Sequence, residues 1–234
     1  MTNIPGQWRE PFPESEIPSV LSALVHCALW LRKISEYEIE NAVSDRLLAP
    51  LDADNDFARC PVEVHREVPT YRRTRKRRTA QVSGRPDFRF VYSTQERKPW
   101  PEFEVEAKRL HTTSKSGRFE DGIGEYVTTA RKKPEREQGM MCFITGRYSH
   151  GLRAGAMLGY VFAGDLARAH ISIAKSIEKH SAKLKLRPGG GLHVSNIVPE
   201  HSAISESLHD LAEEVDIGAP AAGHFSIYHL LVAV

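Results

Sequence analysis

Two short stretches in the middle of the sequence alternate apolar with polar residues, a pattern typical of half-buried strands. The first, GRPDFRF, carries Asp87, and the second, FEVEAKRL, carries Glu106 and Lys108. Lys108 follows Glu106 by two residues, so both side chains point to the same face of the second strand. If the two strands are neighbours with Asp87 and Glu106 on facing positions, they bring two carboxylates and an ammonium group together.

Such a cluster predicts a site for a divalent cation. Carboxylates that lie close together repel each other unless a positive charge neutralises them. Hard oxygen ligands select Mg²⁺, with Mn²⁺ as a substitute. We therefore expect Asp87 and Glu106 to be metal ligands, with Lys108 beside them to orient a water molecule or to stabilise developing negative charge.

The sequences Pro86-Asp87 and Glu106-Ala107-Lys108 resemble the motif of the PD-(D/E)XK nuclease superfamily. A second triplet of the same type, Glu96-Arg97-Lys98, stands in a polar run just before Pro99-Trp100-Pro101. That run lacks apolar alternation, so we interpret it as a loop. The alternative for the triplet at Glu106 is that it lies on a solvated strand face and matches the motif by chance.

The resemblance implies a role for each residue of the motif. Asp87, Glu106 and the main-chain carbonyl of Ala107 would hold Mg²⁺, which lowers the pKa of a bound water molecule. Lys108 would position or help deprotonate that water and would stabilise the pentavalent phosphorane. Glu104 is expected on the same strand face as Glu106, further from the metal.

The superfamily usually adds an acid from the helix that precedes the strands. We expect this helix to begin at Ser35, which has the spacing of a capping box with Glu38, and to end near Leu48. Glu36 then falls in the middle of the inward face, Glu40 lies at its edge, and Glu38 points the opposite way. An acid that faces a sheet is unfavourable unless it is paired or serves a metal, which favours Glu36, with Glu40 second. The alternative is that Glu36 merely sits in the first helical turn, where the helix dipole attracts negative charge.

A basic run between the first two expected strands, residues 71–78, predicts contact with nucleic acid. Cations that contact phosphates release counterions and supply affinity that does not depend on base sequence. A solvated hairpin tip is the alternative interpretation. The six cations are Arg72, Arg73, Arg75, Lys76, Arg77 and Arg78.

The expected architecture is one α/β domain over residues 19–234, preceded by an extended, proline-rich arm over residues 1–18. The order helix, three strands, helix, strand is the core layout of the superfamily, which implies a restriction-endonuclease-like mixed central sheet flanked by helices, with additional C-terminal strands and helices. Helices are expected over residues 19–33, 35–48, 119–130, 165–185 and 204–215, and strands over 62–68, 87–92, 102–109, 140–145, 157–163, 192–198 and 225–232.

Composition limits the environment of the chain. Three cysteines are an odd number at wide spacing, which forms neither a disulfide framework nor a zinc pattern and favours a reducing cytoplasm. The longest apolar run, Val20–Leu31, is too short to span a bilayer, and no signal peptide is visible, so we expect a core or interface helix there and no membrane partner.

These observations predict a cytoplasmic, Mg²⁺-dependent DNA nuclease. A family-level likeness of residues 139–165 to short prokaryotic defence nucleases implies a setting in defence against phage and other foreign DNA. The expected partners are DNA, further copies of the chain and a separate ATPase, helicase or other protein subunit for any energy-driven step. Two alternatives stay open: a non-catalytic nucleic-acid-binding or assembly subunit with the same fold, and an RNA nuclease.

Overall fold

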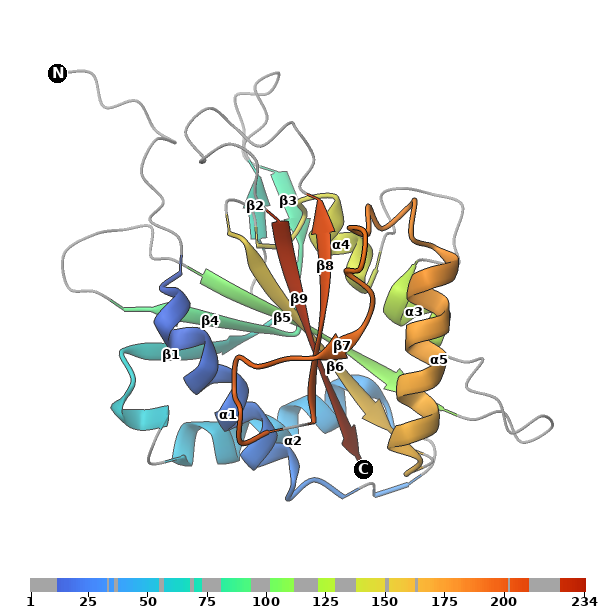
Figure 1. Ribbon diagram of the computed structural model, residues 1–234. Coiled ribbons are helices and arrows are strands. Elements are labelled where there is room, and N and C mark those ends of the chain that lie inside the picture. Colours follow the sequence, from blue (N-terminus) through green and yellow to red (C-terminus); the bar gives the residue numbers. More distant parts are fainter. Residues whose placement is uncertain are drawn as a thin grey trace, which may run out of the picture.

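The computed structural model contains one mixed sheet with helices on both of its faces (Figure 1). Seven strands lie in the order β1-β4-β5-β6-β9-β8-β7, and β2 and β3 form a separate hairpin. This arrangement confirms the expected α/β class with a mixed central sheet.

The structure describes residues 12–32, 34–35, 38–54, 57–67, 70–72, 81–93, 102–111, 122–128, 138–149, 152–162, 164–201, 203–210 and 224–234. The strands are β1 (Val62–Arg66), β2 (Thr70–Arg72), β3 (Gln81–Gly84), β4 (Phe88–Tyr92), β5 (Glu102–Leu110), β6 (Ala154–Val161), β7 (His193–Val194), β8 (Ile204–Asp210) and β9 (His224–Ala233).

Two apolar clusters cover the two faces of the sheet. On one face, α1 and α2 pack against the sheet, and on the other face α3, α4 and α5 do so. Each large apolar side chain buried in these layers contributes roughly 1.5–3 kcal/mol relative to full exposure. The helices are α1 (Ile17–Ala28), α2 (Glu40–Ala53), α3 (Ile123–Val127), α4 (Met140–Ile144) and α5 (Leu166–Lys179), with short 3-10 turns η1 (Glu14–Glu16) and η2 (Phe57–Arg59).

The three central strands, β5, β6 and β9, run parallel to one another, and the strands on either side of them are antiparallel to their neighbours. Every residue of β6 is buried, as expected for a strand that is covered on both faces. A Cβ atom at Gly155 of β6 would lie 2.4 Å from the ring of Phe143. The glycine therefore lets α4 pack closely against the sheet.

Helix α5 confirms the helix that the apolar periodicity predicts after residue 165. Ala169, Ile173 and Ile177 recur every four residues and are buried against the sheet. The Asp165 carboxylate accepts a hydrogen bond from the main-chain N–H of Arg168 at 2.9 Å and so caps the helix. The helix ends at Lys179, earlier than expected, with His180 as its C-cap.

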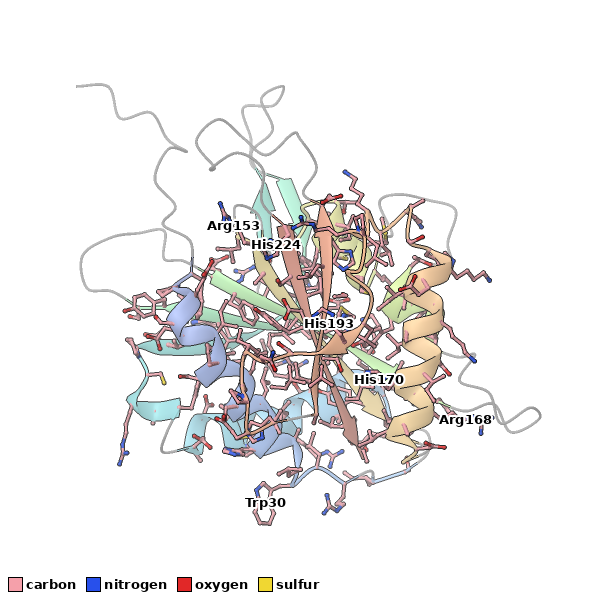
Figure 2. All side chains as sticks on the ribbon, in the orientation of Figure 1. Trp30, Arg153, Arg168, His170, His193 and His224 are labelled. Atoms are coloured by element: carbon pink, nitrogen blue, oxygen red, sulfur yellow. The ribbon has the colours of Figure 1, made fainter. Side chains whose placement is uncertain are left out.

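The N-terminal part differs from the expected arm. The turn η1 begins at Glu14, and α1 begins at Ile17, so the described residues before 19 are already folded. Helix α1 ends at Ala28, inside the apolar run. Trp30, just beyond it, is 83 % exposed and projects away from the sheet (Figure 2).

Two secondary-structure predictions are wrong. Residues 140–144 form α4 instead of a strand, and Ile204–Asp210 form strand β8 instead of the start of a helix. Both segments are short, and at that length apolar spacing cannot distinguish a helix from a buried strand. Pairing of β8 with β9 over seven residues decides its conformation. The strand expected over residues 192–198 is reduced to the two residues of β7.

A chain of hydrogen bonds crosses the interior between α3 and the C-terminal strands. His209 Nδ1 lies 2.8 Å from the carbonyl oxygen of Leu184, which can only accept, so Nδ1 carries the proton. His209 Nε2 therefore accepts from the hydroxyl of Ser207, whose oxygen accepts in turn from His229 Nε2, each at 2.8 Å. The other ring nitrogen of His229 accepts from the hydroxyl of Tyr126 at 3.0 Å. The chain of donors is complete only while both histidines are neutral.

Candidate active site

The pairing of β4 with β5 brings Asp87 and Glu106 together. Phe88 lies opposite Val105 in this antiparallel pair. One residue further along the same register, Asp87 lies opposite Glu106, so both side chains project from the same face of the sheet. The facing arrangement expected from the two alternating stretches is therefore present.

Both carboxylates are almost fully buried, with Asp87 7 % and Glu106 5 % exposed. Asp87 Oδ2 accepts a hydrogen bond from the main-chain N–H of Ala107 at 2.7 Å. Burial and the neighbouring charge of Glu106 raise the pKa of Asp87 to about 7. Burial also raises the pKa of Glu106, against the opposing effect of Lys108. The pair is therefore electrostatically strained when both groups are ionised.

Lys108 lies within this acid pair and is 7 % exposed. Its Nζ atom is 2.8 Å from Glu106 Oε1 and 3.2 Å from Glu40 Oε1, and it donates a hydrogen bond to the carbonyl of Ala107 at 2.6 Å. Burial alone would lower the pKa of Lys108, but the surrounding carboxylates raise it above its ordinary value. Lys108 is therefore a fixed positive charge rather than a base, so its action would be electrostatic stabilisation.

Glu40 is the helix acid that reaches this cluster. It is the first residue of α2, and its Oε2 accepts a hydrogen bond from the main-chain N–H of Arg109 at 2.8 Å, while Oε1 contacts Lys108. Burial raises the pKa of Glu40. Glu36, the residue preferred from the sequence, lies outside the described residues.

The expected start of this helix was wrong, so the helical-wheel positions derived from it for the glutamates do not apply. Helix α2 begins at Glu40, with the extended residue Ile39 as its N-cap, and runs to Ala53. Glu38 does not point away into solvent: it is buried, accepts from the main-chain N–H of Ile34 and forms an ion pair with Arg46 at 2.6 Å. The main-chain N–H of Glu38 donates to the carbonyl of Ser35 at 3.2 Å, before the helix begins.

The donor atoms of the cluster fit a divalent cation. Glu106 Oε2 is buried and has no hydrogen-bond partner in good geometry, although the Tyr148 side chain lies close enough to lower the pKa of Glu106; an oxygen satisfied this weakly is suited to a metal. Asp87, Glu106 and the carbonyl of Ala107 are all hard oxygen donors. No group of three His, Cys, Asp or Glu side chains suited to a metal occurs within the described ranges, so these two carboxylates would act with the carbonyl and water. Lys108 now contacts two of the same three donor groups, Glu106 and the Ala107 carbonyl.

Glu104 lies on the same strand face as Glu106 but has a structural role. It pairs with Arg89 at 3.3 Å and accepts a hydrogen bond from the main-chain N–H of Ser149. Glu104 therefore ties β5 to the segment after α4.

Tyr148 is a neighbour of the site that the sequence did not reveal. It lies between α4 and β6, and its hydroxyl donates to the main-chain carbonyl of Arg85 at 2.9 Å. Its segment has no apolar periodicity, so no pattern in the sequence marks it. The thiol of Cys142 is also buried near Glu106, and burial, followed by the charge of Glu106, raises the pKa of Cys142 to about 12.

Of the basic run, only the first two residues, Tyr71 and Arg72, lie within the described part of the chain. Arg72 ends β2, which pairs with β3 in the separate hairpin. The other five cations, residues 73 and 75–78, lie outside the described residues, as does the second triplet, residues 96–98. Their predicted roles stay predictions.

Comparison of the chain with family models, with curated proteins and with solved structures finds no match. Within the described residues, no helix combines the length and the apolar character needed to cross a membrane. Within the described residues, Cys27, Cys60 and Cys142 form no disulfide bond.

The strain in the acid pair gives a prediction for the metal-free protein. Asp87→Asn is expected to raise the melting temperature at pH 8 by a few degrees, or about 1 kcal/mol, and to raise it by less at pH 5. The folded pKa of Asp87 is raised to about 7, so its contribution to stability is present below its unfolded pKa and is lost as the pH rises through 7. Thermal unfolding in EDTA at both pH values measures the effect. The exposed Asp52→Asn is the control, and an equal gain from it would show a general charge effect.

Proposed function

We propose that the protein is a metal-dependent nuclease of the PD-(D/E)XK type that hydrolyses phosphodiester bonds in DNA. The observation that carries the proposal is the buried cluster of Asp87, Glu106 and Lys108 on two neighbouring strands. A solvated strand face would leave these charges exposed. Burying three ionisable groups opposes folding unless they are paired, and one oxygen of Glu106 has no hydrogen-bond partner in good geometry. Such an arrangement of buried ionisable groups is typical of a catalytic site.

The order of the elements supports the same superfamily. Helix α2, strands β1, β4 and β5, helix α3 and strand β6 follow the order helix, three strands, helix, strand that the resemblance implies. Strand β6, over Ala154–Val161, takes the place of the final core strand that was expected at residues 140–145, and it pairs with β5 in parallel. The β2–β3 hairpin, helices α4 and α5 and strands β7 to β9 are then additions to a restriction-endonuclease-like core.

Each residue of the cluster would have a separate role in phosphodiester hydrolysis. A divalent cation held by Asp87, Glu106 and the carbonyl of Ala107 would activate water and neutralise phosphate charge. Lys108 supplies a fixed positive charge for the phosphate oxygens, on which negative charge grows as the water oxygen bonds to phosphorus. The ester bond to the sugar oxygen breaks and that oxygen takes up a proton from solvent, while the attacking water releases one of its protons to solvent. Glu40 holds Lys108 in place. The low-dielectric surroundings strengthen each of these interactions.

A cleavage assay tests the proposal directly. Plasmid, linear duplex, single-stranded DNA and RNA are incubated with the protein in Mg²⁺, in Mn²⁺ and in EDTA. We expect cleavage of DNA that requires the metal. Cleavage of RNA alone would show that RNA, and not DNA, is the substrate. Binding of nucleic acid without cleavage in either metal would favour the alternative of a non-catalytic subunit. Defence against foreign DNA in a prokaryotic cytoplasm, as a homo-oligomer or with an ATPase or helicase subunit, is the setting we propose.

Glu40 gives a prediction for the same assay. Glu40→Gln is expected to lower cleavage by about 10- to 100-fold, because the neutral amide no longer fixes the ammonium of Lys108, which lies 3.2 Å away. Glu38→Gln is the matched control, since Glu38 pairs with Arg46 instead. Glu38→Gln should lower the melting temperature more than the cleavage rate. Equal rate losses in the two variants would remove Glu40 from the site.

The basic run gives a prediction for DNA binding. Replacing Arg75, Lys76, Arg77 and Arg78 with serine is expected to weaken binding to every duplex sequence alike. Each lost phosphate contact should reduce the slope of log affinity against log salt by about 0.9. Binding isotherms from about 50 to 300 mM salt measure that slope. The control replaces four exposed lysines in and just after α5. Equal slopes in wild type and in the basic-run variant would contradict phosphate contact. These lysines are Lys175, Lys179, Lys183 and Lys185.

A further inference from the structure

The side chain of Tyr148 is held rigidly beside the acid cluster. Tyr148 is 5 % exposed, and its ring packs edge-on against Phe143 with 5.6 Å between the ring centroids. Its main-chain N–H donates to the carbonyl of Cys142 at 2.9 Å. The next residue, Ser149, donates its main-chain N–H to the Glu104 carboxylate. The segment that carries Tyr148 is therefore fixed both to α4 and to β5.

The hydroxyl of Tyr148 acts on the segment that leads into Asp87. It donates to the carbonyl of Arg85 at 2.9 Å, and only Pro86 separates Arg85 from Asp87. The proline ring fixes the main-chain φ angle, so this link is stiff. On its other side, Asp87 is held through its carboxylate by the N–H of Ala107. Asp87 is thus restrained from two directions, and Tyr148 provides one of them.

The phenol also remains a donor under all ordinary conditions. Burial raises the pKa of Tyr148 well above its usual range, and the negative charge of Glu106 raises it further. The hydroxyl hydrogen therefore stays on the oxygen, and the hydrogen bond to the Arg85 carbonyl does not switch with pH.

We propose that Tyr148 is a positioning residue of the metal site: through the carbonyl of Arg85 it fixes Asp87 at the spacing from Glu106 that a shared divalent cation requires. This inference rests on the proposed nuclease function. Hydrogen bonds behind metal ligands fix ligand orientation, and their removal typically lowers metal affinity by about 10- to 100-fold. A purely packing role for the ring would be retained by phenylalanine, so the hydroxyl alone distinguishes the two roles.

The test compares Tyr148→Phe with Tyr160→Phe. Tyr160 is also buried and loses a comparable hydrogen bond, to Ser44 Oγ at 2.9 Å, but it contributes to the apolar cluster on the opposite face of the sheet from Glu106. Mn²⁺ affinity is measured by calorimetry, and DNA cleavage is measured across a Mn²⁺ titration. We expect Tyr148→Phe to bind Mn²⁺ about 10- to 100-fold more weakly and to regain most of its lost cleavage as Mn²⁺ is raised. Tyr160→Phe should keep the wild-type affinity.

A second variant probes the same link without altering the phenol. Pro86→Ala loosens the connection between Arg85 and Asp87, and we expect it to weaken Mn²⁺ binding in the same direction. Wild-type Mn²⁺ affinity in both Tyr148→Phe and Pro86→Ala would overturn the role of Tyr148 and leave the nuclease proposal standing. A wild-type protein that neither binds Mn²⁺ nor cleaves nucleic acid would overturn both.

Discussion

Lys108→Ala is expected to lower the turnover of DNA by about 10²–10⁴-fold, the range for a group that stabilises charge or transfers a proton in the transition state. The structure holds the ammonium between Glu106 and Glu40, and its pKa is raised, so it is a positive charge at any working pH. Alanine removes that charge from a buried site, where water replaces it poorly. Single-turnover cleavage at saturating DNA and metal isolates the chemical step.

Metal affinity should respond in the opposite sense to turnover in this variant. The Nζ atom of Lys108 now contacts Glu106 and the Ala107 carbonyl, two of the three groups proposed as ligands. Removing the ammonium leaves those oxygens without it and leaves the carboxylate charges unneutralised, so the variant should bind Mn²⁺ at least as tightly as wild type does. Mn²⁺ should also raise the melting temperature of the variant by more than it raises that of wild type. Lys98→Ala, in the other triplet, is the control. A loss of turnover from Lys98→Ala, with none from Lys108→Ala, would show that the wrong triplet was chosen.

The combined variant Asp87→Ala, Glu106→Ala is expected to abolish both Mn²⁺ binding and cleavage. It removes both side chains that could bind the ion, and the Ala107 carbonyl and water alone bind divalent ions weakly. The fold should survive, because the change also removes two buried charges that repel each other. Calorimetry with Mn²⁺, together with circular dichroism, separates loss of binding from loss of structure.

Glu63→Ala is a suitable control for the double variant. Glu63 lies on β1 of the same sheet, with its side chain 53 % exposed, so its removal changes the net charge but not the cluster. We expect wild-type Mn²⁺ binding from this control. Mn²⁺ binding that persists at full strength in the double variant would refute the metal site.

The parts of the site that lie on strands could be predicted from the sequence, because a strand has a simple two-residue period. The alternation around Glu106 placed its side chain with that of Lys108, and the neighbouring stretch placed Asp87 opposite. The position of the helix acids could not be derived in this way, because the expected start of the helix was wrong. The spacing of Ser35 and Glu38 matches a capping box, yet α2 begins only at Glu40.

The remaining features depend on contacts between segments that are distant in the sequence. Glu40 reaches the main-chain N–H of Arg109, 69 residues away, and Tyr148 reaches the carbonyl of Arg85, 63 residues away. Neither contact leaves a local pattern in the sequence. Residues 140–144 are uniformly apolar, so their sequence alone does not distinguish a helix from a buried strand; in the structure they form α4, and Phe143 packs over Gly155.

The hydrogen-bond chain through His209 and His229 gives the two halves of the sheet opposite responses to acid. Burial lowers the pKa of His209 to about 4 and lowers that of His229 well below its usual value. An unfolded histidine takes up a proton near pH 6.5, so stability falls as the pH drops from about 6.5 to 4. The contribution of Asp87 is instead lost as the pH rises through about 7. In the metal-free protein, amide exchange should therefore be fastest around β8 and β9 in mild acid and around β4 and β5 in mild base, so that pH selects which side of one continuous sheet opens first.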